Sequence, residues 1–149
     1  QQPLLYLSLF FKQHRARYYE LLDDVRQRGD WEEWLRFFLE GVEMTATAAV
    51  ATAHRLLALF RRDEGRLGGL GRRSASVLKV FLAIRQRPLT SVAQIQSISG
   101  LSYPTCSKAL DILGNLGIVQ EITGGRRNRL FAYSDYLAIL SEGTDPLPR

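Results

Sequence analysis

Residues 97–119 read SISGLSYPTCSKALDILGNLGIV, and this stretch decides the fold of the second half of the chain. Apolar residues recur at helical spacing on both sides of a break that Gly100, Ser102 and Pro104 mark. Gly100 permits a turn with positive φ, Ser102 is a common N-cap residue, and Pro104 is tolerated in a first helical turn. The stretch therefore predicts a helix, a short turn and a second helix, as in a helix-turn-helix.

Two helices are predicted before the turn. The first lies in SASVLKVFLAIRQRP, residues 74–88, and Pro88 closes it. Thr90 or Ser91 caps the second, so three helices follow one another up to residue 113. The side chains predicted to face the core are Val77, Val80, Phe81, Ile84, Val92, Ile95, Ile98, Cys106, Ala109, Leu110 and Leu113.

A basic hairpin is predicted after the third helix. Residues 118–122 and 129–133 have the composition of strands, and GGRRN between them is typical of a turn. A last helix is predicted from Ser134. Three helices followed by a two-stranded hairpin indicate a winged helix-turn-helix, which we assign to residues 69–149.

The first 68 residues are predicted to be helical. One helix follows Pro3, another ends at Gly29, and a long helix begins at Trp31 and continues for about eight turns. The glycine-rich stretch at residues 66–71 is interpreted as a hinge. We therefore expect a mainly α protein, in which a helical bundle at residues 1–68 precedes the winged helix-turn-helix.

Charge and cysteine content restrict the partners that we expect. The 149 residues carry a net charge of +5, and all of this excess lies in residues 69–149, which favours an anionic partner. Cys106 is the single cysteine, so an internal disulfide is excluded and a reducing, cytoplasmic setting is expected. No signal peptide is recognised, and the apolar stretch 44–60 is too short and alanine-rich to span a membrane, so no membrane partner is expected.

The helix after the turn and the hairpin tip supply a candidate nucleic-acid interface. Such a helix can enter the major groove, where hydroxyl groups and Lys108 reach phosphates or base edges. Arginines on the hairpin can neutralise backbone charge. The candidate residues are Ser102, Tyr103, Thr105, Ser107, Lys108, Arg126, Arg127 and Arg129.

The same pattern is compatible with a structural or protein-binding role. Lys108 and Asp111 cancel one another's charge on the outward face of the helix, and arginines at a hairpin tip are often only solvated. Many winged domains contact proteins, and a fold does not imply a function. DNA contact and protein contact are therefore both kept as hypotheses at this point.

Residues that could carry catalysis are few. His14 and His54 are the only histidines, and neither has a carboxylate or a nucleophile at an interpretable spacing. The stretch Gly68-Gly69-Leu70-Gly71 lacks the spacing and the Lys-Ser/Thr pair of a phosphate-binding loop. We therefore assign no catalytic residue, no metal site and no cofactor to this chain.

Residues 3–42, PLLYLSLFFKQHRARYYELLDDVRQRGDWEEWLRFFLEGV, resemble the segment that follows the catalytic helix in Fic-family proteins. Leu-Tyr-Leu-Ser at residues 5–8, the Tyr18-Tyr19 pair and Gly-Asp-Trp-Glu-x-Trp at residues 29–34 carry the resemblance. A long helix and then a winged helix with SYPT at its turn and GGRRNRLF on its wing are also similar to C-terminal regions of that family. The resemblance extends over essentially the whole chain.

The resemblance implies a parent protein that transfers AMP from ATP, with Mg, to a hydroxyl of a target protein. The catalytic motif of the family, His-Pro-Phe-x-x-Gly-Asn-Gly-Arg, is absent and is expected before Gln1. The inhibitory Ser/Thr-x-x-x-Glu-Gly/Asn signature is also missing, because Arg36, Phe60 and Ala138 stand four residues before the three Glu-Gly pairs. The chain is thus expected to be a non-catalytic C-terminal piece of such an enzyme, and ATP and Mg are implied for the parent alone.

The resemblance leaves three functional hypotheses. The winged module binds nucleic acid or regulates the enzyme; it contacts proteins, positioning targets or forming a homodimer; or the chain is a separate transcriptional regulator whose helical half dimerises. Separated from a catalytic partner, residues 1–60 are expected to expose Leu4, Leu7, Phe10 and Phe11 and to self-associate through them.

Overall fold

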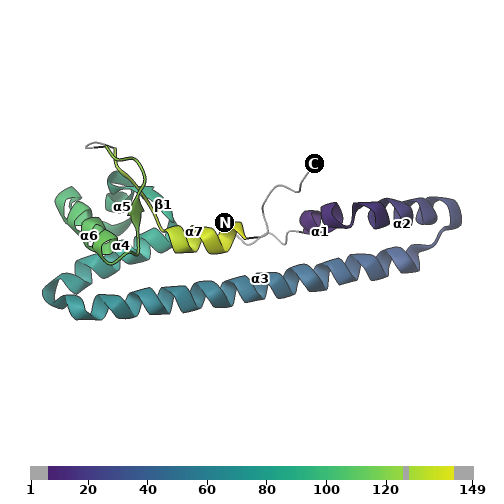
Figure 1. Cartoon of the computed structure of the whole chain (residues 1–149), viewed down its shortest axis with the longest axis horizontal. Coiled ribbons are helices and arrows are strands. Elements are labelled where there is room, and N and C mark those ends of the chain that lie inside the picture. Colours follow the sequence, from purple (N-terminus) through teal and green to yellow (C-terminus); the bar gives the residue numbers. More distant parts are fainter. Residues whose placement is uncertain (1–6, 126–127, 143–149) are drawn as a thin grey trace. The chain divides into compact units, whose positions relative to one another are not determined.

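The computed structural model describes residues 7–125 and 128–142, which are mainly helical with one small antiparallel sheet (Figure 1). By its internal contacts the chain divides into two compact units, Gln1–His54 and Arg55–Arg149. No helix among the described residues is both long enough and apolar enough to cross a membrane.

The described part of the first unit is helical. Its elements are α1 (Leu7–Gln13), α2 (Arg15–Arg28) and the first part of α3 (Trp31–Leu67). Gly29 ends α2 in the left-handed region, with φ of 69°, and its N–H donates to the carbonyl of Val25. The predicted stop at Gly29 and the predicted long helix are confirmed, and α3 continues beyond Phe60 to Leu67.

The core of the first unit is a small aromatic cluster. Phe10, Leu21 and Phe37 are buried, and Leu7, Phe11, Tyr18 and Trp34 pack around them. Gly41 of α3 makes this packing possible, because a Cβ there would lie 2.6 Å from Cδ1 of Phe10. The expectation that Phe10 is exposed was therefore wrong, since its ring fills the space beside Gly41; Leu4 lies outside the described residues.

The second unit continues from the end of α3 through a 3-10 helix, Gly68–Arg73, into the predicted helical stretch. Its remaining elements are α4 (Ser74–Gln86), β1 (Leu89–Ser91), α5 (Val92–Ser99), α6 (Tyr103–Asn115), β2 (Gln120–Glu121), β3 (Leu130–Ala132) and α7 (Ser134–Ser141).

The sheet of the second unit has three strands in the order β1-β3-β2, and both pairings are antiparallel. Thr90 lies opposite Phe131 on one side of β3, and Gln120 lies opposite Ala132 on the other. The hairpin was predicted from the sequence and β1 was not, and both predicted hairpin strands are shorter in the structure.

The core of the second unit lies between α4, α5, α6, the sheet and the end of α3. All of the predicted core residues of α4 and α6 are buried, and so are Val92 and Ile95 of α5. The prediction for Ile98 was wrong, because its side chain is 38% exposed. Ser99 takes the inward position in the last turn of α5, where its Oγ lies 3.6 Å from Sγ of Cys106.

The boundary between the two compact units falls within α3, between His54 and Arg55. Leu59 and Leu67, near the C-terminal end of α3, are buried in the core of the second unit. The assignment of residues 1–68 and 69–149 to two domains rests instead on charge and glycine content, and it stays a prediction.

Candidate nucleic-acid interface

A complete capping box fixes the start of α5. Oγ of Ser91 accepts a hydrogen bond from the backbone N–H of Gln94 at 3.3 Å, and Oε1 of Gln94 accepts one from the N–H of Ser91 at 3.0 Å. This satisfies two backbone donors at the helix start, which otherwise lack partners. Of the two caps that the sequence left open, the structure uses Ser91, while Thr90 is buried in β1.

The turn between α5 and α6 has the helix end and the helix start that the sequence predicted. Gly100 has φ of 69° and donates its N–H to the carbonyl of Gln96 at 3.0 Å. Ser102 stands at the N-cap of α6, and Pro104 lies in the first turn, both as predicted. The Ser102 side chain does not cap the helix, however, because its Oγ lies 2.8 Å from Oγ1 of Thr105 in a hydrogen bond between the two hydroxyls.

Helix α6 has a buried and a solvent-facing side. Tyr103 is 50% exposed, Lys108 is exposed, and Thr105 and Ser107 are half-buried. The structure thus brings the candidate residues of this helix to its outward side, and Ser102 is exposed at its start. Their contact with nucleic acid stays a prediction.

Arg129, the last residue before β3, connects the hairpin to α6. Its Nε donates to Oε2 of Glu121 at 2.8 Å, and its Nη2 donates to Oδ1 of Asp111 at 3.0 Å. The guanidinium lies over the ring of Phe131, 4.8 Å from its centre. The hydrogen bond to Glu121 raises the pKa of Arg129, so this arginine is a charged and firmly held link.

These contacts reduce the positive charge that Arg129 can present to a polyanion. The sequence interpretation placed it with Arg126 and Arg127 as a charge at the hairpin tip, but two carboxylates already balance its charge. Asp111 is therefore engaged by Arg129, and Lys108 has no ion-pair partner within the described residues. Arg126 and Arg127 lie outside the described residues.

Further cations are exposed in the second unit. Arg73, Lys79 and Arg87 are exposed and, like Lys108, form no ion pair with any described residue. They were not predicted as site residues, although they are part of the excess positive charge of residues 69–149. They increase the positive potential of the unit without specifying a sequence.

A polar network around the buried carboxylate of Asp63 joins α3 to the end of the sheet, and it was not predicted from the sequence. Asp63 is fully buried, and the hydroxyl of Tyr133 donates to its Oδ2 at 2.5 Å. Nε of Arg62 lies 2.8 Å from Oδ1 of Asp63, and Nη1 of Arg66 lies 3.5 Å from the same oxygen. Arg62 also reaches Asp135 of α7, with Nη2 and Oδ2 at 2.8 Å.

The network determines the ionisation of its members. Burial alone would raise the pKa of Asp63, but hydrogen bonds from Arg62 and Tyr133 and the charges of Arg62 and Arg66 together lower it. Burial and the hydrogen bond to Asp63 raise the pKa of Tyr133. The pair is a charged carboxylate and a neutral phenol, which suits a structural connection.

The histidines take different positions in the first unit. Both are exposed, but the ring of His14 lies against the aromatic cluster, with its centre 4.5 Å from that of Phe10, while His54 lies on α3. A hollow of about 180 Å³ is lined by Phe10, His14, Arg17, Glu33, Arg36, Phe37 and Glu40. No cluster of metal-ligating side chains occurs in the described ranges.

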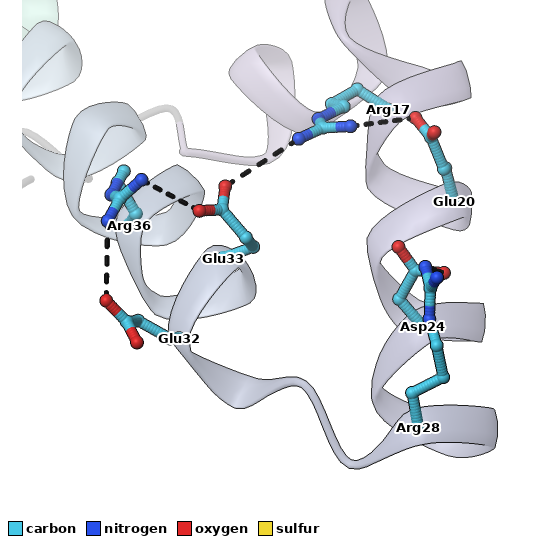
Figure 2. A network of polar contacts seen from close by, with 7 residues as sticks. All are labelled: Arg17, Glu20, Asp24, Arg28, Glu32, Glu33 and Arg36. Carbon is cyan, nitrogen blue, oxygen red and sulfur yellow. Dashed lines mark hydrogen bonds and ion pairs between the residues drawn. The ribbon is translucent and has the colours of Figure 1, made fainter.

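Three of the charged groups at this hollow, Arg17, Glu33 and Arg36, form ion pairs with one another (Figure 2). Nη2 of Arg17 lies 3.8 Å from Oε2 of Glu33, and Nη1 of Arg36 lies 2.7 Å from Oε1 of Glu33. Glu33 therefore links α2 to α3 and is already balanced by two arginines, which makes the hollow a weak candidate for binding a charged ligand.

No protein-family model matches the chain. The resemblance to Fic proteins therefore rests on the residues quoted above and stays a prediction, as does the winged helix.

Proposed function

We propose that the second unit is a winged helix-turn-helix that binds the backbone of double-stranded nucleic acid, within the non-catalytic C-terminal region of a Fic-type AMP-transferase. The order α4, β1, α5, α6, β2, β3 with sheet order β1-β3-β2 supports this assignment. Helix α6 enters the major groove, and the β2–β3 hairpin is the wing. AMP transfer belongs to the parent enzyme, which would supply the catalytic motif and bind ATP and Mg.

One observation carries the nucleic-acid proposal: Asp111 pairs with Arg129, so it does not neutralise Lys108 on the outward face of α6. The Asp111 carboxylate is held by Nη2 of Arg129 at 3.0 Å, so Lys108 remains the cation available on that helix. A lysine beside the Ser102 and Thr105 hydroxyls can contact consecutive phosphates, while Tyr103 reaches toward bases. The ion pair also anchors the wing, so that Arg126 and Arg127 can follow the adjacent backbone.

The salt dependence of binding tests this proposal. Fluorescence anisotropy with a random duplex should give a weak affinity, in the range of about 10⁻⁴–10⁻⁶ M that is usual for non-specific binding. Lys108→Ala should reduce the slope of log K against log salt by about 0.9, and the double change Arg126→Ala with Arg127→Ala by about 1.8. Lys12→Ala removes one charge from α1, in the first unit, and should leave the slope unchanged.

Contact with a protein is the second candidate. It is favoured by the balance of Arg129 against Asp111 and Glu121, which lowers the net charge next to α6. Absence of duplex binding at low salt would reject nucleic-acid binding and leave protein contact as the better explanation. Equal slopes for Lys108→Ala and Lys12→Ala would reject the contact of α6 with phosphates.

A further inference from the structure

Helix α3 carries an apolar stripe that the first unit does not cover. Leu35, Leu39, Val50 and Leu57 are 52%, 62%, 56% and 48% exposed. At 100° per residue they lie within a sector of about 60°, roughly opposite to Phe37 and Gly41, which face the aromatic cluster. Exposed apolar side chains gathered along one helix face mark a contact surface.

The spacing along this stripe reads the same in both directions. Its members are Leu35, Leu39, Val42, Ala46, Val50, Ala53 and Leu57, separated by 4, 3, 4, 4, 3 and 4 residues. Ala46 is the centre, and the positions at equal distances from it pair Val42 with Val50, Leu39 with Ala53, and Leu35 with Leu57.

We propose that this stripe binds a second copy of the chain, with the two α3 helices antiparallel and a twofold axis passing at Ala46. A twofold axis requires a self-complementary surface, and the palindromic spacing provides one. Ala46 meets its own copy, so the helix axes can approach closely at the centre, and Leu39 packs into the space left by Ala53 of the second copy. At the ends of the stripe, Leu35 pairs with Leu57 of the second copy.

The charges of α3 agree with the antiparallel arrangement. The part of α3 before Ala46 contains four glutamates and one arginine, while residues 47–61 contain two arginines and no carboxylate. Antiparallel packing places the acidic half of each copy beside the basic half of the other. Glu32 already pairs with Arg36 of its own helix, and Arg55 pairs with Glu142. The charges of this stretch without an ion-pair partner among the described residues are Glu40 and Glu43 before Ala46 and Arg61 after it. Parallel helices would instead bring the two acidic halves together.

Sedimentation of the full chain tests whether a second copy of the chain binds to the apolar stripe of α3. The 16.9 kDa chain should sediment as a dimer at high concentration. Ala46→Arg places two like charges at the axis and should raise the dissociation constant by about 30-fold or more, as expected at the centre of an interface. Ala51→Arg is the matched control, because this exposed alanine lies about 130° around the helix from the stripe, and it should leave the dimer intact.

Cross-linking tests the register. Val42→Cys mixed with a tagged Val50→Cys should form an intermolecular disulfide, because these positions face one another in the antiparallel dimer. Val42→Cys alone should not, since its two copies would lie about 12 Å apart along the axis, beyond the reach of a disulfide. The native chain is the control, because Cys106 is buried.

A chain that stays monomeric at all concentrations would overturn the proposal and leave the stripe to another partner. Equal dimerisation of the Ala46→Arg and Ala51→Arg variants would place the interface elsewhere. A disulfide from Val42→Cys alone would show parallel packing and would equally reject the arrangement.

Discussion

Among the described residues, the first unit buries three large side chains in one cluster, Phe10, Leu21 and Phe37. The second unit has a cluster of seventeen buried residues, Phe81 and Leu110 included. The ion pairs of the first unit lie at its surface, where such pairs contribute about 0–1 kcal/mol each. The second unit buries a carboxylate and satisfies it from several directions. The comparison indicates that the second unit is stabilised by its own core, while the first depends more on surfaces that a partner can cover.

The largest expected effect comes from removing a core leucine of the second unit. Leu113 is fully buried, and Leu113→Ala should lower the free energy of unfolding by about 2–5 kcal/mol, because a closely packed core cannot collapse onto the cavity. Hydrogen exchange on the full chain should show faster exchange in α4, α5 and α6 together. Leu82→Ala, at a position 42% exposed on α4, is the matched control and should change little.

Leu21→Ala makes the same change in the small cluster of the first unit. It should speed exchange in α1 and α2 without altering exchange in α4, α5 or α6. The comparison of the two units fails if Leu113→Ala acts on α6 alone, or if Leu21→Ala reproduces the effect of Leu113→Ala in the second unit.

The second prediction concerns the buried carboxylate. The folded-state pKa of Asp63 is below the ordinary value of 3.8, so its charge stabilises the fold above that pH and this stabilisation is lost as pH falls through the folded pKa. Asp63→Asn should lower the free energy of unfolding by about 1.5–3 kcal/mol at neutral pH, the range for hydrogen bonds to charged groups. The difference from the native chain should shrink when urea unfolding is repeated at about pH 3.

Asp135→Asn provides the control for this experiment. Asp135 binds the same Arg62, but its side chain is 56% exposed, so its removal should cost less than about 1 kcal/mol. The free energies of unfolding of Asp63→Asn and of the native chain could instead differ by the same amount from neutral to acid pH. That result would show that the charge of Asp63 contributes nothing to stability.

Local features of the fold were predictable from the sequence, and contacts between distant segments were not. Helical periodicity, Gly29, Gly100 and Pro104 act within a few residues, and they identified the helices and the turn correctly. The strand β1 has three residues, too few for an alternating pattern, and it forms only because β3 pairs with it. The link between Asp63 and Tyr133 spans 70 positions, so no spacing rule could indicate it.

The candidate site divides in the same way. Cys106 and Ala109 lie on the buried face of α6, and Lys108 lies on a different face at helical periodicity, so its outward position was predictable. The partners of Arg129 could not be inferred, because its contacts to Asp111 and Glu121 require the hairpin to fold back against α6. Helical periodicity therefore predicted that Lys108 lies on the outward side of α6, but the sequence could not indicate which charges are already neutralised.

The smallest expected effect belongs to the surface ion pairs of the first unit. Arg17 lies 3.0 Å from Glu20 within α2 and 3.8 Å from Glu33 of α3, and all three side chains are at least 41% exposed (Figure 2). Arg17→Gln should therefore change the free energy of unfolding by less than about 1 kcal/mol. Hydrogen exchange in α2 should show a difference at low salt that disappears at about 1 M salt, where the Debye length is about 3 Å.

Arg26→Gln is the matched control, because Arg26 pairs only with Asp23 of its own helix among the described residues, at 3.7 Å, and is 82% exposed. A larger effect of Arg17→Gln than of Arg26→Gln would measure what the connection between α2 and α3 adds to a pair within one helix. If Arg17→Gln destabilised the first unit as much as Leu21→Ala, the first unit would depend on its charges instead of its aromatic cluster. The two units would then differ in the kind of interaction that stabilises them, ion pairs in the first and an apolar core in the second, as well as in core size.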